Sequence, residues 1–293
     1  MRNQLYEIYY IPEIKIKDKK VSIDSTVKYL FELHDSECIE SVVMKYKHGY
    51  SICISTQAGC KMGCSFCQTG KGGFVRNLSP SEMLLQIEKA QEYLNIKISN
   101  IVLMGMGEPL DNYENLLKFL RMLTDENGQN LSMRNVTVST CGIVPRIYDL
   151  AREKLSITLA LSLHATTDER RREIMPIANT YTISECMAAC RYYFEETGRR
   201  VTFEYSLIKG VNDSLRDAKE LAALAGSISA HINLIPVNPV RERDYEQPDL
   251  SAVQAFRAKL EKHGINVSIR RVLGRDIDGA CGQLRHRHIE ISG

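Results

Sequence analysis

The sequence predicts an α/β protein whose core is an open, partial (β/α)6 barrel of the TIM-like kind. Short runs rich in Val, Ile and Leu alternate with longer runs that carry apolar residues at three- and four-residue spacing. This alternation is expected for parallel strands joined by surface helices. The chain has 293 residues, which is enough for a barrel that forms a single domain.

The expected strand and helix pairs follow one another from residue 51. The first pair begins with the apolar run 51–56, and its helix extends to about residue 94. That helix is predicted by Ser79-Pro80-Ser81-Glu82, which supplies an N-cap, a proline at the first helical position and a capping-box glutamate. The other pairs are expected at 99–104 and 112–125, 134–140 and 145–153, 156–163 and 184–197, 201–208 and 214–228, and 231–237 and 250–263.

Further strands are expected on both sides of the barrel. Residues 27–34 and 38–46 predict two strands joined by a turn at Asp35 and Ser36, and INVSIRRVL after residue 264 predicts a last strand. The expected division of the chain is an N-terminal extension with a β-hairpin at 1–50, a barrel core at 51–264, and a C-terminal strand and tail at 265–293.

The composition predicts a cytoplasmic protein without membrane association. Hydrophobic residues make up 44% and charged residues 25% of the chain, which is ordinary for a globular protein. The sequence contains neither the apolar core of a signal peptide at its start nor a run long enough to span a bilayer. Nine cysteines in such a protein are more often reduced, metal-binding or catalytic than paired in disulfides.

Basic residues are clustered, although the net charge is only +2. A charge this small does not by itself indicate a nucleic-acid-binding protein. Basic clusters can contact phosphate groups, but each alone is more often a solvated surface. The clusters lie at 15–20, 170–172, 270–271 and 285–288.

Three cysteines lie close together after the first expected strand. Cys60, Cys64 and Cys67 form a Cys-x3-Cys-x2-Cys pattern among several glycines. Thiolates bind iron, and a 4Fe-4S cluster held by three cysteines leaves one iron open to a substrate or cofactor. Structural zinc is the competing interpretation, but zinc normally takes four ligands, and the usual second pair of Cys or His is missing from the sequence. The pattern therefore predicts an iron–sulfur cluster.

The cysteine pattern resembles the signature of the radical S-adenosylmethionine (SAM) superfamily, and the resemblance extends from about residue 51 to 240. Phe66, just before the third cysteine, also fits. The resemblance implies a partial barrel of the radical SAM type. It further implies that the methionine part of SAM binds the open iron. An electron from the cluster then breaks a carbon–sulfur bond of SAM and gives a 5′-deoxyadenosyl radical.

Further motifs closely resemble the RlmN/Cfr family of radical SAM RNA adenosine methyltransferases, in the same order from about residue 27 to 284. These motifs are CISTQAGC at 53–60, MGMGEP at 104–109, SLHA at 162–165, GVND at 210–213, NLIPVNP at 233–239 and GACGQL at 279–284. The resemblance implies that Cys281 takes a methyl group from one SAM and that the radical from a second SAM activates it. The resulting methylene radical adds to the adenine. Cys53 then releases the product by forming a disulfide with Cys281, and Glu40 is the implied base for the ring proton.

The same resemblance implies a set of SAM-binding residues. Gly107 and Glu108 match positions that contact the amino group of SAM, where a carboxylate accepts charge-assisted hydrogen bonds. The other matching positions are Ser139, Ser162, Leu163, His164 and Asn238. Without the resemblance, Glu40 would be interpreted as an exposed strand carboxylate and His164 as a core histidine. Cys186 and Cys190 are expected to pack in the core, whereas Cys38, Cys141 and Met104 have no expected role.

The implied partners are RNA and an electron donor such as flavodoxin or ferredoxin, and the protein is expected to be a monomer. The favoured substrate is an adenosine of 23S rRNA, with tRNA as a second candidate. Carbon 2 is the favoured target because housekeeping members of the family are the more numerous. Methylation of carbon 8, which is associated with ribosomal antibiotic resistance, stays open because CQTG at 67–70 resembles the Cfr form.

Family members usually carry a helical N-terminal domain that assists RNA binding, and most of it is absent before residue 27. The basic segment 15–20 is a candidate substitute for this domain, or the RNA substrate differs from that of the family.

Two alternatives to this RNA-modifying activity stay open. A radical SAM activase or small-molecule enzyme would tolerate the loss of Cys53 and Cys281. A metal-stabilised RNA-binding protein would hold zinc and no iron.

Overall fold

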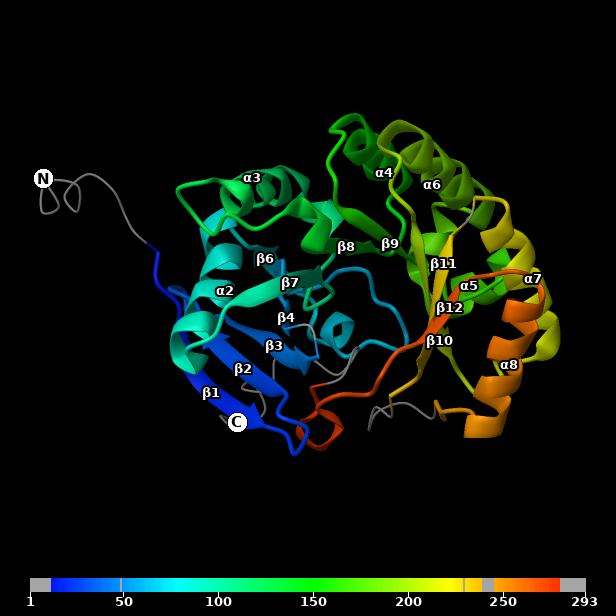
Figure 1. Ribbon diagram of the computed structural model, residues 1–293, viewed down its shortest axis with the longest axis horizontal. Coiled ribbons are helices and arrows are strands. Elements are labelled where there is room, and N and C mark those ends of the chain that lie inside the picture. Colours follow the sequence, from blue (N-terminus) through cyan, green and yellow to red (C-terminus); the bar gives the residue numbers. More distant parts are fainter. Residues whose placement is uncertain (1–11, 48, 229, 239–244, 280–293) are drawn as a thin grey trace, which may run out of the picture.

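The computed structural model describes residues 12–47, 49–228, 230–238 and 245–279. Within these residues, ten strands form one main sheet. The strands of its parallel part curve around a common interior (Figure 1), which confirms the expected open barrel. In spatial order they are β4 (Gly49–Cys53), β7 (Ile98–Leu103), β8 (Val136–Thr140), β9 (Thr158–Ser162), β10 (Thr202–Leu207), β11 (His231–Pro236) and β12 (Val267–Ile269).

The expected helices cover the outer face of this sheet (Figure 1). They begin and end within two residues of their expected ranges. They are α2 (Pro80–Leu94), α3 (Tyr113–Thr124), α4 (Val144–Arg152), α6 (Ile183–Thr197), α7 (Leu215–Gly226) and α8 (Leu250–Lys262). The expected capping box of α2 is present, because the Ser79 side chain accepts a hydrogen bond from the Glu82 N–H and the Glu82 carboxylate accepts one from the Ser79 N–H. None of the helices in the described ranges is long and apolar enough to cross a membrane.

Antiparallel strands extend the sheet beyond β4. The expected hairpin is confirmed as β2 (Val27–Glu32) and β3 (Cys38–Tyr46), and β3 pairs with β4. An additional strand, β1 (Lys15–Val21), pairs with β2 at the edge of the sheet. Its lysines protect an edge strand against pairing with other chains. The basic segment 15–20 is thus part of a strand. Strands from all three expected parts of the chain lie in one sheet.

The first parallel strand differs from its expected range of 51–56. It begins at Gly49 and ends at Cys53. The next residues leave the strand because they bond to the loop after β7, with the Thr56 N–H donating to Met106 O at 2.8 Å. A small second sheet follows, in which β5 (Gln57–Gly59) pairs with β6 (Phe74–Asn77). These two short strands enclose the cysteine loop, and their pairing depends on residues on both sides of it, so local patterning did not predict them.

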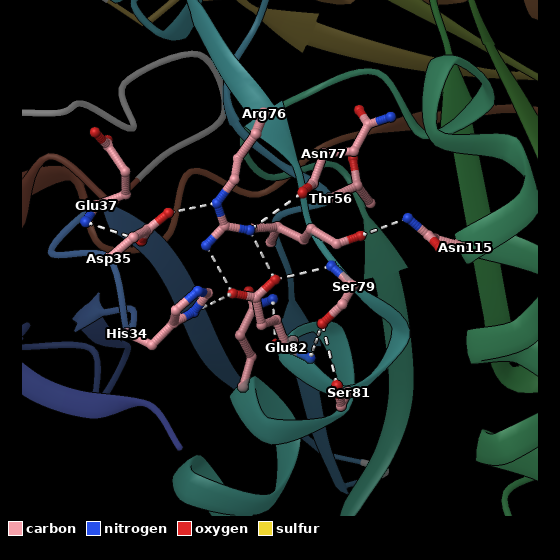
Figure 2. A network of polar contacts seen from close by, with 12 residues as sticks. His34, Asp35, Glu37, Thr56, Arg76, Asn77, Ser79, Ser81, Glu82 and Asn115 are labelled. Atoms are coloured by element: carbon pink, nitrogen blue, oxygen red, sulfur yellow. Dashed lines mark hydrogen bonds and ion pairs between the residues drawn. The ribbon is translucent and has the colours of Figure 1, made fainter. Parts of the chain in front are cut away.

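A polar network joins β6 to the hairpin turn and to the start of α2 (Figure 2). Arg76 donates to Asp35 and also to the two oxygens of Glu82, at 2.9 and 2.8 Å. The Nδ1 atom of His34 lies 3.5 Å from Glu82 Oε1. Burial raises the pKa of Glu82, but the hydrogen bonds from Arg76 and Ser79 outweigh burial and hold the pKa below its usual value. The network therefore anchors the strand that leaves the cysteine loop.

Two features of the parallel part of the fold were not expected. The short helix α5 (Asp168–Ile174) lies between β9 and α6. Its run of charged residues looked like a solvated cluster, yet Arg171 is fully buried. The last strand was expected to continue from residue 265 to 273, but β12 covers only Val267–Ile269 and pairs in parallel with β11.

Candidate active site

A cavity lies at the carboxyl ends of the parallel strands, where the loops of such barrels carry the chemistry. The cysteine loop and the ends of β7 to β11 line it. The structure thereby brings together most of the site residues expected from the sequence, namely Cys60, Cys64, Cys67, Gly107, Glu108, Ser139, Ser162, His164 and Asn238. Leu163 lies beside them but is completely buried behind the cavity wall.

The cysteine loop is folded back on itself by main-chain contacts. The Cys60 N–H donates to Gly73 O at 2.7 Å, and the Cys67 N–H donates to Cys64 O at 3.1 Å. At Gly59, φ is +76°, and a Cβ atom would lie 2.0 Å from Gly73 O. Only glycine fits this close approach, so the loop closes just before the first cysteine.

The three thiols fit a 4Fe-4S cluster better than a single metal ion. Burial raises the pKa of Cys60 to about 12 and raises that of Cys64 further, and the neighbouring thiols act in the same direction. Bound iron would relieve this cost by stabilising the thiolates. In the described part of the chain, no three Cys, His, Asp or Glu side chains converge on one ion. A 4Fe-4S cluster instead takes each cysteine on a separate iron.

Glu108 is oriented by main-chain hydrogen bonds at the end of β7. Its Oε1 atom accepts from the Leu110 N–H at 3.0 Å, and its Oε2 atom accepts from the Cys141 N–H at 2.7 Å. Burial raises the pKa of Glu108, although these two N–H groups oppose the effect. A buried carboxylate of this kind favours a cationic partner, as the ammonium group of SAM would be. Cys141, which had no expected role, thus helps to hold Glu108.

His164 lies on the cavity wall as a neutral side chain. Its Nδ1 atom accepts a hydrogen bond from the Ser206 N–H at 2.9 Å, so its proton is on Nε2. Burial, followed by the charges of Arg171 and Arg270, lowers the pKa of His164 to about 3. Its ring packs against the Phe66 ring at a centroid distance of 4.7 Å and an interplanar angle of 73°. His164 therefore links the end of β9 to the cysteine loop.

A second cavity adjoins the first. Cys53 lies in this second cavity, with Tyr46 from β3 and Arg271 and Gly279 from the segment after β12. The residues that line both cavities are Met104, Ile235, Asn238 and Arg270. Met104, which had no expected role, thus stands at the boundary of the two cavities. Cys281 lies outside the described residues, two positions beyond Gly279.

Glu40 is a buried side chain, unlike the exposed strand carboxylate that the sequence alone would suggest. Its Oε1 atom lies 2.9 Å from Lys28 Nζ, and the Glu40 side chain is only 5% exposed. Lys28 also donates to Asp278 O at 3.1 Å. The Glu40–Lys28 pair therefore contacts the segment that leads to Cys281.

Two charged residues of the first cavity were not expected from the sequence. Glu204 accepts a hydrogen bond from Asn233 at 2.9 Å, and the Arg270 guanidinium lies 3.9 Å from it. Arg270 also contacts the Met104 sulfur at 2.9 Å. Burial raises the pKa of Glu204, and Arg270 opposes that shift. A glutamate inside the apolar strand TFEYSL is the available signal in the sequence, whereas Arg270 belongs to a basic cluster of the kind that is more often a solvated surface.

Two other cysteines lie away from both cavities. Cys186 and Cys190 on α6 are completely buried in the hydrophobic core, which confirms the expected packing role.

The fold and the cysteine-lined cavity define a radical SAM protein. The model of the radical SAM superfamily matches residues 54–222. A solved structure of a radical SAM methyltransferase from Sphaerobacter thermophilus superposes with a TM-score of 0.93 at 43% identity, covering 97% of this chain and 85% of that one. SuiB from Streptococcus suis, bound to S-adenosylmethionine, shares the fold alone, with a TM-score of 0.56 at 15% identity, covering 76% of this chain and 52% of that one.

Curated relatives show to which family of the radical SAM superfamily the chain belongs. The probable dual-specificity RNA methyltransferase RlmN of Lachnospira eligens is 57% identical over 284 residues, covering 97% of this chain and 81% of the relative. The protein of the same name from Clostridioides difficile is 52% identical over 289 residues, covering 98% of this chain and 84% of the relative. The chain belongs to the RlmN family of the radical SAM superfamily.

Proposed function

We propose that this protein methylates carbon 2 of an adenosine in RNA through an S-methylcysteine formed on Cys281. One observation carries the proposal beyond the family name. The cavity that contains the cluster cysteines adjoins a second cavity that holds Cys53 and reaches Gly279, which is two positions before Cys281 in the sequence. A radical SAM activase has no need of a thiol in such a second cavity, whereas methyl transfer through cysteine requires two thiols outside the cluster.

The residues of the first cavity would bind and orient the cofactors. Cys60, Cys64 and Cys67 would hold a 4Fe-4S cluster, which supplies the electron that cleaves SAM. Glu108 would accept hydrogen bonds from the ammonium group of SAM. His164 would offer its Nε2–H as a neutral donor. The remaining proposed contacts are Gly107, Ser139, Ser162, Leu163 and Asn238, of which Leu163 would act through its main chain.

The residues around the second cavity would carry the methyl group. Cys281 would take the methyl group of one SAM, lose a methyl hydrogen to the radical derived from a second SAM, and join the adenine through the resulting methylene. Glu40 would remove the ring proton, and the unpaired electron would return to the oxidised cluster, which leaves a thioether between Cys281 and the base. The thiolate of Cys53 would then attack the Cys281 sulfur, which forms the disulfide and breaks the carbon–sulfur bond, and the released carbon would take up a proton to give the methylated base. An external reductant would afterwards restore both thiols.

The proposed partners are RNA and a one-electron donor such as flavodoxin or ferredoxin, and the protein would act as a cytoplasmic monomer. The favoured RNA is 23S rRNA, with tRNA as a second candidate. Arg271 is exposed at the second cavity, where a guanidinium can bind a phosphate of the RNA backbone. All the described cysteines are free, which suits a reducing compartment.

Mass spectrometry tests the proposal at two levels. The purified protein with a reconstituted cluster is incubated with SAM without oxygen and digested, and we expect one added methyl group on the peptide that contains Cys281. Cys281→Ala should remove the added mass. An unmethylated peptide in the cluster-loaded protein would contradict the proposal.

The RNA product identifies the target atom. We expect 2-methyladenosine in rRNA from cells that carry the gene and none at the same position after its deletion. Nucleoside mass spectrometry with both methyladenosine standards gives the methylated carbon and, from separated rRNA and tRNA, the substrate. A product with 8-methyladenosine would instead assign the carbon 8 activity that residues 67–70 leave open.

A further inference from the structure

Helix α5 places an arginine side chain entirely inside the protein, directly behind the cysteine loop. Arg171 has no exposed surface and is the largest fully buried side chain among the described residues. It extends to the carboxyl ends of β8 and β9. Its Nη2 atom donates to Cys141 O at 2.6 Å and to Ser162 O at 3.2 Å, and its Nε atom donates to Leu163 O at 3.2 Å.

These three carbonyl groups do not neutralise the guanidinium. The Nη1 atom is buried and has no hydrogen-bond partner within the described structure. No ion pair between described residues includes Arg171, although its neighbour Arg170 pairs with Asp217 at 2.9 Å. Burying a charge without a counter-ion is strongly unfavourable. No described side chain bonds directly to Arg171 as a counter-ion, so an anion close to Arg171 would be strongly stabilised.

The cysteine loop lies against the same part of the molecule. The Ser65 N–H donates to Ile174 O at the end of α5, at 2.9 Å. Cys64 and Phe66 pack against a small apolar cluster that includes Cys141 and Ile174. Arg171 thus lies behind the wall that Cys64 faces. Glu108 bonds to the N–H of Cys141 while Arg171 bonds to its carbonyl, so a peptide group separates these two charges.

We propose that Arg171 is the counter-cation of the iron–sulfur cluster and raises the reduction potential of that cluster. The inference rests on the proposed function, because it requires a cluster at Cys60, Cys64 and Cys67. A 4Fe-4S cluster with three thiolates is an anion, and accepting one electron from the external donor adds a negative charge. A buried cation nearby stabilises the reduced form more than the oxidised form. Arg171 is in this sense a positioning residue that acts through the cluster.

The test compares two substitutions that separate charge from hydrogen bonding. Arg171→Gln keeps an N–H donor for the carbonyl groups but removes the charge, whereas Arg171→Lys keeps the charge. Each full-length variant is reconstituted with iron and sulfide, and its iron content is determined. The midpoint potential is then measured by a redox titration followed by electron paramagnetic resonance. Arg172→Met, at an exposed position of α5, is the matched control.

We expect Arg171→Gln to bind iron at the wild-type level and to have a more negative midpoint potential than the wild type. Arg171→Lys should lie close to the wild type, and Arg172→Met should be indistinguishable from it. An unchanged potential in a fully loaded Arg171→Gln protein would overturn the inference. If Arg171→Gln does not fold, a more negative potential in a fully loaded Arg171→Lys would overturn it. A wild-type protein that binds no iron would contradict the proposed function itself.

Discussion

A single residue, Glu108, shows how the main chain can prepare a binding group. Two backbone N–H groups hold its two oxygens at 3.0 and 2.7 Å, while burial raises its pKa. The carboxylate is thus oriented before a ligand binds, and a positively charged ligand would stabilise it most. The sequence motif identified the residue, but its orientation depends on Cys141, which directly follows the next strand, β8.

We expect Glu108→Gln to weaken SAM binding about 10-fold or more, because a hydrogen bond to a charged group contributes about 1.5–3 kcal/mol. Glutamine keeps the size of the side chain but replaces one acceptor oxygen with an amide donor. Isothermal titration of cluster-loaded protein with SAM measures the change. Glu114→Gln, at an exposed position of α3, should leave the affinity unchanged. Wild-type affinity in Glu108→Gln at equal iron content would exclude the proposed contact.

At the scale of elements, the end of β7 packs main chain against main chain with the segment after β4. The Gly105 N–H donates to Ile54 O at 3.0 Å, and the Met106 N–H donates to Ser55 Oγ at 2.9 Å. A Cβ atom on Gly105 would lie 2.6 Å from Ile54 O. Backbone atoms cannot rotate away as a side chain can, so the contact requires glycine.

We expect Gly105→Ala to lower the free energy of unfolding by about 1–3 kcal/mol, the usual cost of forcing extra volume into a packed site. Urea denaturation followed by circular dichroism gives the value. Gly226→Ala at the end of α7 is the control, because the nearest atom to its Cβ would be 3.7 Å away. For Gly226→Ala we expect the free energy of unfolding to equal that of the wild type or to exceed it by up to about 0.5–1 kcal/mol. Equal stability of Gly105→Ala and wild type would mean that the two segments separate easily.

The polar network around Arg76, which joins β6 to α2 (Figure 2), is expected to stabilise the fold. We expect Arg76→Met to lower the free energy of unfolding by about 3 kcal/mol, because the buried Glu82 carboxylate then loses its arginine partner. Arg152→Met removes an exposed pair with Asp149 and should cost less than about 1 kcal/mol. Urea denaturation at pH 7 compares the two variants, and losses of similar size would show that burial of Glu82 does not matter.

The ion pair between Arg76 and Glu82 also predicts that the stability of the protein depends on pH. The pKa of Glu82 in the folded protein lies below 4.5, its ordinary value. The unfolded chain therefore takes up the proton first as the pH falls, and the stability from the Arg76–Glu82 pair is lost as the pH passes through the folded pKa. We expect the stability difference between wild type and Arg76→Met to shrink below about pH 4.5. A difference that is constant from pH 7 to pH 3 would contradict this assignment.

At the scale of the whole molecule, the two non-cluster thiols of the proposed reaction come from distant parts of the chain. Cys53 lies at the end of β4, and Gly279, two positions before Cys281 in the sequence, lies after the last strand, yet both Cys53 and Gly279 line the second cavity. The curved sheet makes this possible because β4 and β12 are the first and last strands of its parallel part.

We expect Cys53→Ala to methylate Cys281 normally but to remain covalently attached to RNA, because no thiol releases the adduct. Cys281→Ala should be inactive and form no adduct. Denaturing gel electrophoresis with labelled RNA, followed by mass spectrometry, distinguishes the two. Cys190→Ala, which changes a thiol of the core, should turn over and release its product. Multiple turnovers by Cys53→Ala would rule out the proposed role of Cys53.

The sequence by itself determined the alternating strands and helices of the barrel, the capping box of α2 and the loop that carries Cys60, Cys64 and Cys67. These features depend on residues close together in the chain, such as Ser79 with Glu82 or three cysteines in one loop. The tertiary structure decided what depends on distant contacts. It buried Arg171 against carbonyl groups at the ends of β8 and β9, placed Glu204 beside Arg270, and set Cys53 in a second cavity that adjoins the one lined by the cysteine loop. A charged side chain looks the same in sequence whether it faces water or the interior, so only the packed fold distinguishes the two.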